Sequence, residues 1–160
     1  TPPLSTPPTR TEQFYQALRQ RHGRRLDGCI LPPPSFLSMQ GEILAFDEGA
    51  GTLSVRFPIQ ESQLNAYRTL QGGFLAAAVD STFGPLGLLV APPNVTRRME
   101  LTYSLPATLE RGCIQFHAGL TSRSGQTREL GAGVRDPQGR RLARAKATHW
   151  ILQPLAEPPG

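Results

Sequence analysis

The sequence predicts an α+β domain in which an antiparallel sheet of about five to six strands wraps around one long central helix, with a further helix at the N-terminus. Three observations predict this fold. The run from Leu70 to Ala91 is almost wholly apolar and is long enough to form the central helix. Beyond Pro93 apolar and polar residues alternate, which is the period of strands. Turn residues separate these strands at hairpin length, so the strands are antiparallel.

The N-terminal half is predicted to contain one helix and one hairpin. Thr9–Arg21 has apolar residues at i, i+3 and i+4 spacing, with Thr9 or Thr11 as the cap. The three prolines at 32–34 end any helix before them. Two strands then flank a Gly-rich turn at Asp47–Gly51, namely Met39–Phe46 and Thr52–Ile59.

The long apolar helix comes next, and four strands follow it. Pro85 lies inside the helix, and we expect it to kink the helix or to end it early. The strands that follow are predicted at Met99–Leu105, Ile114–Leu120, Arg128–Val134 and Leu142–Leu152, with turns at Ser122–Gly125 and Asp136–Gly139.

The two ends of the chain are rich in proline and are predicted to lie outside the folded domain. The sequence is divided into a flexible N-terminus at 1–8, an N-terminal helix and linker at 9–34, one domain at 35–153, and a flexible tail at 154–160. The central domain is long enough for a single hydrophobic core.

The net charge of +5 comes almost entirely from arginine, which supplies 16 of the 17 basic residues. These arginines are spread along the chain, and no aromatic residues alternate with them as in a single-strand binder. We therefore predict no nucleic-acid partner and favour a phosphate-bearing small molecule. A charged residue and Pro85 inside the apolar run argue against a membrane span.

The cysteines and histidines do not match a metal site. Cys29 and Cys113 have no zinc spacing, and the three histidines lie far apart in the sequence. We predict no metal and no cofactor, and a reducing cytoplasmic location. His117 and His149 are interpreted as surface histidines or as histidines with satisfied hydrogen bonds.

Asp80 is the only charged residue between Arg68 and Arg97. Burying an ionised carboxylate in apolar surroundings costs on the order of several kcal/mol unless the group is paired or protonated. Two readings stay open: a buried structural acid that is paired with an arginine or caps a neighbouring element, or an acid kept for chemistry.

The segment from Asn65 through Gln71, Gly72 and Gly73 to Asp80 resembles the PaaI-like hotdog acyl-CoA thioesterases of the 4-hydroxybenzoyl-CoA thioesterase superfamily. Their pattern is an Asn, a short loop, His-Gly-Gly at a helix start, and an acid eight residues after the first Gly. Thr96, the strand Met99–Tyr103, Pro106, Gly112 and the Ser122–Gly125 turn also match, so the resemblance covers Ser35 to Leu152. It implies the hotdog fold. One departure is Gln71, where the family often has His.

The resemblance implies thioester hydrolysis. Free N–H groups at the helix start, beginning with Gly72, would stabilise the negative charge that develops on the carbonyl oxygen. Asn65 would orient the carbonyl or a water molecule, and Thr96 would reach the site from its strand. Asp80 would be a general base or a nucleophile, and the sequence leaves both open. Asn65 and the Gly pair could also be ordinary turn residues, and Thr96 an ordinary strand residue.

A length argument predicts that the site is shared between subunits. Gly72 and Asp80 are about 12 Å apart along a helix, so one thioester carbon cannot contact both in the same chain. We expect at least a homodimer with antiparallel helices. The resemblance implies a homotetramer built as a dimer of dimers.

Candidate residues for binding coenzyme A are those that can contact its phosphates. They are Gly73, Arg97, Arg98, Arg123, Ser124, Gly125 and Arg128. Each arginine could equally be a solvated strand residue. Phe74, Phe83, Leu86 and Tyr67 are candidate liners of the acyl pocket.

Two other functions stay open. A hotdog module that binds acyl-CoA without hydrolysing it is compatible with Gln71. A hydratase or dehydratase is the least favoured, because it needs His beside the acid and no His lies between His22 and His117.

Overall fold

A computed structural model of the chain describes residues 6–152. Its helices are α1 (Arg10–His22), α2 (Pro34–Ser38) and α3 (Gly72–Val90), with short 3-10 turns at Gly23–Leu26, Glu61–Gln63 and Leu109–Arg111. Its strands are β1 (Glu42–Asp47), β2 (Thr52–Pro58), β3 (Asn94–Tyr103), β4 (Cys113–Ser124), β5 (Thr127–Arg135) and β6 (Arg141–Ile151).

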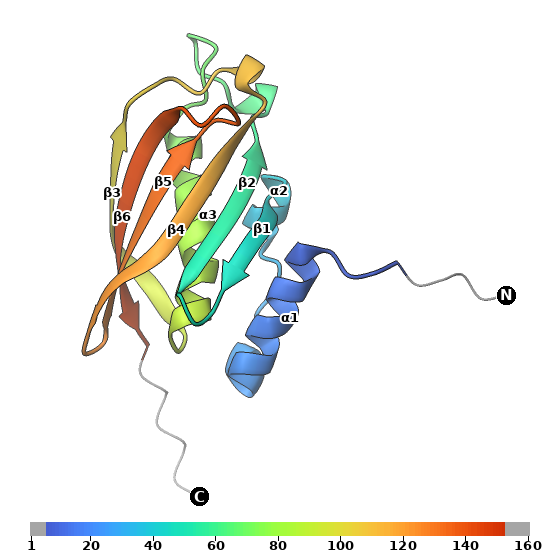
Figure 1. Ribbon diagram of the computed structural model, residues 1–160, viewed down its shortest axis with the longest axis vertical. Coiled ribbons are helices and arrows are strands. Elements are labelled where there is room, and N and C mark those ends of the chain that lie inside the picture. Colours follow the sequence, from blue (N-terminus) through green and yellow to red (C-terminus); the bar gives the residue numbers. More distant parts are fainter. Residues whose placement is uncertain (1–5, 153–160) are drawn as a thin grey trace, which may run out of the picture.

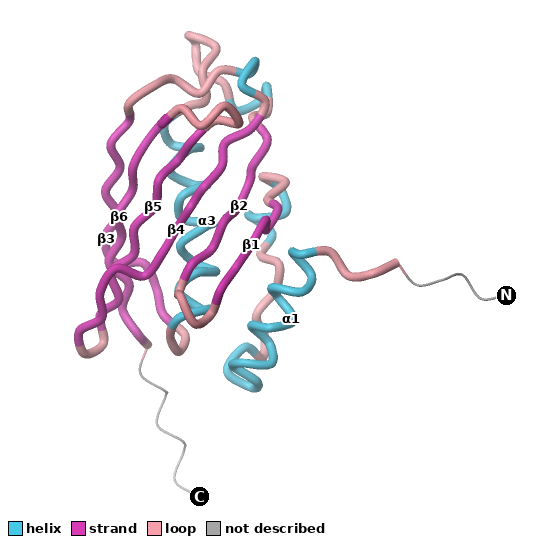
Figure 2. Tube along the Cα trace, viewed as in Figure 1, coloured by secondary structure: helices cyan, strands magenta, loops and turns pink. Residues whose placement is uncertain are grey.

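The strands form one antiparallel sheet in the order β1-β2-β4-β5-β6-β3. The sheet curves around α3, while α1 lies beside β1 at one edge (Figures 1 and 2). The predicted α+β class, the number of strands and the central helix are confirmed. β3 forms the other edge of the sheet.

α3 is the core helix, and its buried side faces the sheet. By length and composition alone it is the one helix within residues 6–152 that could cross a membrane, but more than half of it is buried inside the fold. Burial of this kind is typical of a core helix. One stripe of α3 is left uncovered or half-covered, and most of its residues are small: Gly73, Phe74, Ala76, Ala77, Asp80, Ser81, Gly84 and Leu88.

The expectation that Pro85 would end α3 early is wrong. The helix continues to Val90 with Pro85 inside it. A proline in a helix interior costs about 3 kcal/mol. Leu86 and Leu89 beyond it are 0% and 1% exposed, and burying two such side chains contributes about 1.5–3 kcal/mol each. Packing against the sheet therefore outweighs the local preference.

α1 is capped and packed as its sequence predicts. Thr9 forms a capping box with Glu12, with bonds of 3.0 and 3.1 Å between side chains and backbone amides. Phe14 and Leu18 are fully buried in the same core as the sheet. Residues 39–41 do not join the first strand, because Met39 caps α2 and β1 begins at Glu42. Residues 6–9 are loop, and the remainder of both predicted tails lies outside the described residues.

The predicted turn at 136–139 is built around a buried acid. Asp136 Oδ1 accepts hydrogen bonds from the amides of Gln138 (3.0 Å) and Arg140 (2.9 Å). Arg111 lies 2.5 Å from its other oxygen. Burial raises the pKa of Asp136, but these hydrogen bonds and the Arg111 charge outweigh burial and hold it below its ordinary value.

Candidate active site

Asp80 is linked to the sheet by a chain of hydrogen-bonding side chains. The Thr96 hydroxyl lies 2.8 Å from Asp80 Oδ1 and 3.1 Å from His149 Nε2. His149 Nδ1 lies 2.7 Å from Asn94 Oδ1. One continuous polar chain therefore runs from α3 through the start of β3 to the end of β6.

The environment of Asp80 differs from what its sequence neighbours suggest. Asp80 is exposed, because it lies on the uncovered stripe of α3 while the apolar residues around it in sequence face the sheet. Among the ion pairs of the described residues, none involves Asp80. The structural reading is therefore wrong about burial and about an arginine partner for the described residues, whereas the distant partner that Asp80 does have is Thr96.

His149 belongs to this row of hydrogen-bonding side chains because residues of β6 alternate between the two faces of the sheet. Ala143, Ala145 and Ala147 face α3 and are buried, and His149 continues the same face at 1% exposed, with its ring edge-on to Phe83. Thr96 is its partner in the sheet register. Opposite residues of an antiparallel pair lie on the same face, so the register places the Thr96 hydroxyl beside the imidazole.

The amide of Asn94 fixes the orientation of His149. Asn94 Nδ2 donates to the carbonyls of Gly87 (3.0 Å) and Pro92 (2.8 Å), so Oδ1 must face the imidazole. Since an amide oxygen only accepts, Nδ1 carries the hydrogen. Burial lowers the pKa of His149, against the raising effect of Asp80 and Glu129. A neutral His149 therefore presents Nε2 as an acceptor.

A pocket of about 630 Å³ opens beside Asp80 and Thr96. Its other walls are largely apolar and come from the segment before β1, from α3 and from the start of β3: Leu26, Leu31, Pro33, Phe36, Pro85 and Leu88. None of the four candidate acyl-pocket liners lies here. Phe83 and Leu86 are in the core, whereas Tyr67 is 88% exposed and Phe74 is 37% exposed.

The start of α3 carries the second half of the candidate site. Gly72 is the first helical residue, and Gln71 is an exposed N-cap whose side chain makes no capping bond. Within the described residues, the amide N–H groups of Gly72 and Gly73 donate to no protein acceptor. Such groups at a helix N-terminus are suited to an oxyanion.

Asn65 builds the loop that leads into this helix start. Its Oδ1 accepts from the amides of Tyr67 (2.9 Å) and Thr69 (3.1 Å), and its Nδ2 donates to the Thr69 hydroxyl at 3.0 Å. Within one chain, Asn65 therefore makes the contacts of a turn residue, which was one of the two interpretations of its sequence position.

β3 contacts both halves of the site. Near its start Thr96 bonds Asp80, and at its end the Tyr103 hydroxyl donates to the Gly72 carbonyl at 2.8 Å. Gly72 and Tyr103 line a separate pocket of about 240 Å³ that shares no residue with the pocket at Asp80. The two halves therefore lie apart within one chain.

Apart from Gly73, which lies at the start of α3, the candidate coenzyme A residues gather at one end of the sheet. Arg123 pairs with Arg128 in the register, and Arg128 pairs with His149, so the β4–β5 turn with Ser124 and Gly125 lies next to the row that holds Thr96.

Three of these arginines have protein partners. Arg128 donates to the carbonyls of Gly125 (3.0 Å) and Thr127 (2.9 Å). The Arg97 guanidinium lies 4.3 Å from the centre of the Trp150 ring, and Arg98 pairs with Glu100. Arg123 is exposed and lines a pocket with Arg21 and Glu48.

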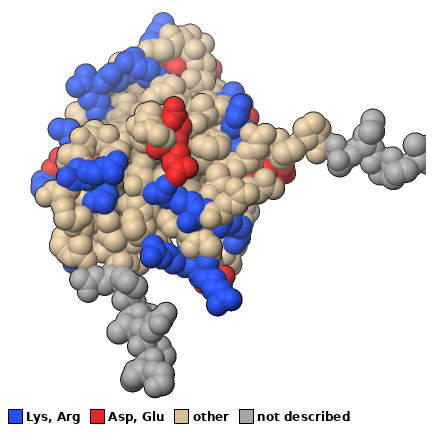
Figure 3. Space-filling model, turned by 60° about the horizontal axis from the view of Figure 1, so that its bottom comes forward, with Lys and Arg blue, Asp and Glu red and all other residues tan. Residues whose placement is uncertain are grey.

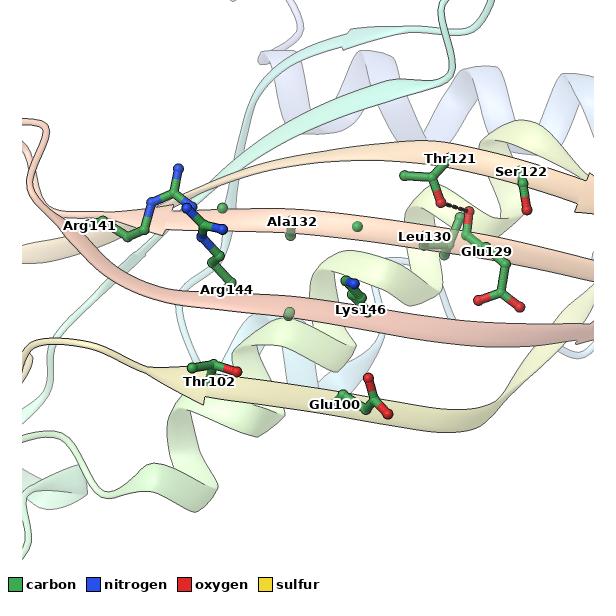
Figure 4. A pocket seen from close by; sticks show the side chains of 13 residues that line it. Glu100, Thr102, Thr121, Ser122, Glu129, Leu130, Ala132, Arg141, Arg144 and Lys146 are labelled. Carbon is green, nitrogen blue, oxygen red and sulfur yellow. Dashed lines mark hydrogen bonds between the residues drawn. The ribbon is translucent and has the colours of Figure 1, made fainter.

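An open groove of about 880 Å³ lies on the outer face of the sheet and contains none of the predicted catalytic or coenzyme A residues. Arg141, Arg144, Lys146, Glu100 and Glu129 lie along it (Figure 4). The face drawn in Figure 3 likewise carries basic side chains in separate groups with acidic ones between them. Among the described residues, no three His, Cys, Asp or Glu side chains are grouped so that they could hold a metal.

Sequence reasoning missed His149, Asn94 and Tyr103. Reading His149 as a satisfied histidine was right about its hydrogen bonds, but the residue that it contacts is the site threonine. The premise that no histidine accompanies the acid is therefore wrong. The sequence did contain one indication of its position: His149 is an even number of residues from Ala143, Ala145 and Ala147, so it lies on the same face of β6 as these helix-facing residues.

Solved structures share this fold. A protein of Ralstonia eutropha, provisionally named a thioesterase related to phenylacetic acid degradation, is 25% identical with a TM-score of 0.71, over 80% of this chain and 97% of that one. The PaaI protein of the phenylacetic acid degradation operon of Escherichia coli is 14% identical with a TM-score of 0.72, over 86% and 95%.

A provisional thioesterase of Streptococcus pneumoniae, solved with coenzyme A, is 19% identical with a TM-score of 0.68, over 74% of this chain and 91% of that one. The same protein has been solved as a Thr-to-Ala and as an Asp-to-Ala variant. No protein-family profile matches the chain, and no curated protein matches it in sequence. The chain therefore has the hotdog fold, and its neighbours of known structure are PaaI and related thioesterases.

Proposed function

We propose that this protein hydrolyses an acyl-CoA, or a related acyl thioester, to the free acid and CoA. The observation that carries the proposal is the hydrogen bond between Asp80 and Thr96 beside a largely apolar pocket. In the Streptococcus pneumoniae protein the Asp and the Thr that were changed to Ala are 16 residues apart, as are Asp80 and Thr96. That spacing supports a shared site.

In the proposed reaction the N–H of Gly72 bonds the thioester carbonyl oxygen, where the helix dipole favours negative charge. Asp80 either takes a proton from the attacking water or attacks the carbonyl carbon itself to give a mixed anhydride. The Thr96 hydroxyl holds the carboxylate in position. Asn65 and Gln71 lie on the Gly72 side, where Gln71 can donate a hydrogen bond to the substrate but cannot titrate.

The complete site is proposed to form between two subunits. β3 is an edge strand with one side free of strand partners within the described chain. If it pairs with β3 of a second copy about a two-fold axis, the two strands run antiparallel. The Tyr103 end of one subunit, which is bonded to Gly72, then lies beside the Thr96 end of the other. Each dimer would hold two sites, and a dimer of dimers would hold four.

The acyl group is proposed to occupy the pocket beside Asp80, and the phosphates of CoA to lie near the β4–β5 turn. Arg123 is the most available of the proposed phosphate contacts, because Arg97, Arg98 and Arg128 already have protein partners. Ser124 and Gly125 are exposed at the β4–β5 turn, and Gly73 is exposed at the start of α3. The cytoplasmic location stays a prediction.

The activity is tested by hydrolysis of short, long and aromatic acyl-CoAs by the wild type and by Asp80→Asn. Because Asp80 is exposed, the variant should fold, and turnover should fall by about 10²–10⁴-fold. Equal turnover in both proteins would contradict the assignment. Binding of acyl-CoA without turnover of any panel member would favour the alternative, a non-catalytic acyl-CoA-binding module, which the exposed Gln71 keeps open.

The composite site is tested by mixing two inactive variants. Gly72→Pro removes the N–H at the first helical position, where proline is tolerated. Refolding it together with Asp80→Asn gives heterodimers with one intact site, so activity should return to about a quarter of wild type. A site within one chain would show no recovery.

A further inference from the structure

The chain of contacts from Asp80 to Asn94 has one hydrogen too few when Asp80 is ionised and His149 is neutral. Nδ1 carries the imidazole hydrogen, because Asn94 Oδ1 only accepts. Nε2 then has a lone pair directed at the Thr96 hydroxyl oxygen, which is 3.1 Å away. The ionised carboxylate also accepts only, and it lies 2.8 Å from the same oxygen.

Thr96 has a single hydroxyl hydrogen and two acceptors in contact with it. It can donate to Asp80 or to His149, and the other contact is then between two lone pairs. One added proton removes this conflict. A protonated Asp80 donates to Thr96, which donates to Nε2; alternatively a protonated His149 donates to Thr96, which donates to the carboxylate.

We propose that Asp80, Thr96 and His149 form a single proton-binding unit, in which one proton is shared between the carboxylate and the buried imidazole through the Thr96 hydroxyl. Both hydrogen bonds of Thr96 are complete only when this proton is present. The protonation of His149 is then coupled to the Asp80 carboxylate through Thr96.

Two other charged residues lie near the imidazole on the neighbouring strand β5, and the side chain of neither is hydrogen-bonded to Thr96 or His149. Glu129 on β5 accepts from the Thr148 hydroxyl at 3.0 Å and lies on the outer side of the sheet. Arg128, opposite His149 on β5, is turned to the carbonyls of its own turn. α3 contributes the Phe83 ring and Asp80. Only Asp80 is connected to Nε2, through one hydroxyl.

The consequence for catalysis rests on the proposed hydrolysis. When Asp80 acts as the base, one O–H bond of water breaks and the water oxygen bonds to the thioester carbon. The proton goes to the carboxyl group and completes the chain through Thr96 to His149. When the C–S bond breaks, the proton leaves on the sulfur of CoA. His149 is a positioning residue in this scheme, because it acts on the carboxylate through Thr96.

The shared proton is tested without substrate by following the imidazole ¹⁵N resonances of His149 by NMR across pH. The proteins are the wild type, Asp80→Asn, Thr96→Val and Thr96→Ser, with exposed His117 in the same spectra as the reference. We expect His149 to titrate at lower pH in Asp80→Asn and Thr96→Val than in the wild type, because the carboxylate or the bridge is lost. Thr96→Ser should restore the wild-type midpoint.

A His149 that titrates at the same pH in all four proteins would overturn the proposal. The result does not depend on whether the protein hydrolyses acyl-CoA, so failure here is distinct from failure of the proposed function. In the active protein, His149→Gln keeps a hydrogen bond to Thr96 but cannot hold the proton. Its kcat should fall at least about tenfold with little change in KM, and an unchanged kcat would remove the catalytic part of the proposal.

Discussion

Gly87→Ala is the sharpest test of the packing that holds His149 in place. Gly87 lies in the last turns of α3, and a Cβ built on it would lie 2.3 Å from Asn94 Oδ1 and 3.0 Å from His149 Nδ1. Atoms cannot approach so closely, so Asn94 must move. Its movement would break its bonds to two carbonyls and its contact with the imidazole.

The size of the effect follows from these contacts. Each lost hydrogen bond costs about 1 kcal/mol, and overpacking costs about 1–3 kcal/mol. The better helix propensity of Ala returns about 1 kcal/mol. We therefore expect Gly87→Ala to lower the free energy of unfolding by about 3–5 kcal/mol.

Gly84→Ala is the matched control, because it lies in the same helix and a Cβ there would meet no atom within 4 Å. It should raise the free energy of unfolding by about 0.5–1 kcal/mol through helix propensity alone. Urea denaturation of both variants and the wild type provides the measurement, with the slope m unchanged. If Gly87→Ala proves as stable as Gly84→Ala, the contacts assigned to Asn94 and His149 are wrong.

Three further substitutions test the rest of the fold, each by urea denaturation. Thr9→Ala removes the capping box of α1 and should lower the free energy of unfolding by about 1 kcal/mol, whereas Thr9→Ser keeps a capping hydroxyl and should lose much less. Phe14→Ala empties a fully buried position where α1 meets the core and should cost about 3–5 kcal/mol; a much smaller loss would mean that α1 is not part of the core. Asp136 has a pKa below its ordinary value, so it stabilises the fold above the pKa of the unfolded chain, and that contribution is lost as pH falls through the folded pKa. Asp136→Asn should therefore be less stable than the wild type at neutral pH, and the difference should shrink in acid; a difference independent of pH would contradict this.

The repeating part of the fold could be predicted from the sequence because burial follows the geometry of each element. Ala143, Ala145 and Ala147 alternate with polar residues, and all three are buried against the helix. The apolar run from residue 70 indicated the core helix for the same reason. Pro85 was misjudged because its effect on a helix is local, whereas the burial of the residues after it depends on the whole sheet.

Part of the candidate site could also be predicted, because Gly72 and Asp80 are close in sequence and their spacing is fixed by one helix. The partners of Asp80 could not be predicted in this way. His149 and Thr96 are 53 residues apart in sequence, and they meet only because β6 lies beside β3 in one particular register. The exposure of Asp80 was misjudged because its apolar sequence neighbours face away from it.

The position of His149 bears on the Gln that replaces the usual His at the helix start. Gln71 lies on the Gly72 side of the site, whereas His149 lies on the Asp80 side, behind Thr96. In the proposed two-fold dimer these sides would belong to different subunits, so a site with Gln71 from one chain would still receive an imidazole from the other. That imidazole is 1% exposed and is joined to Asp80 through the Thr96 hydroxyl. It can therefore support the carboxylate even though Gln71 supplies no titratable group beside Gly72.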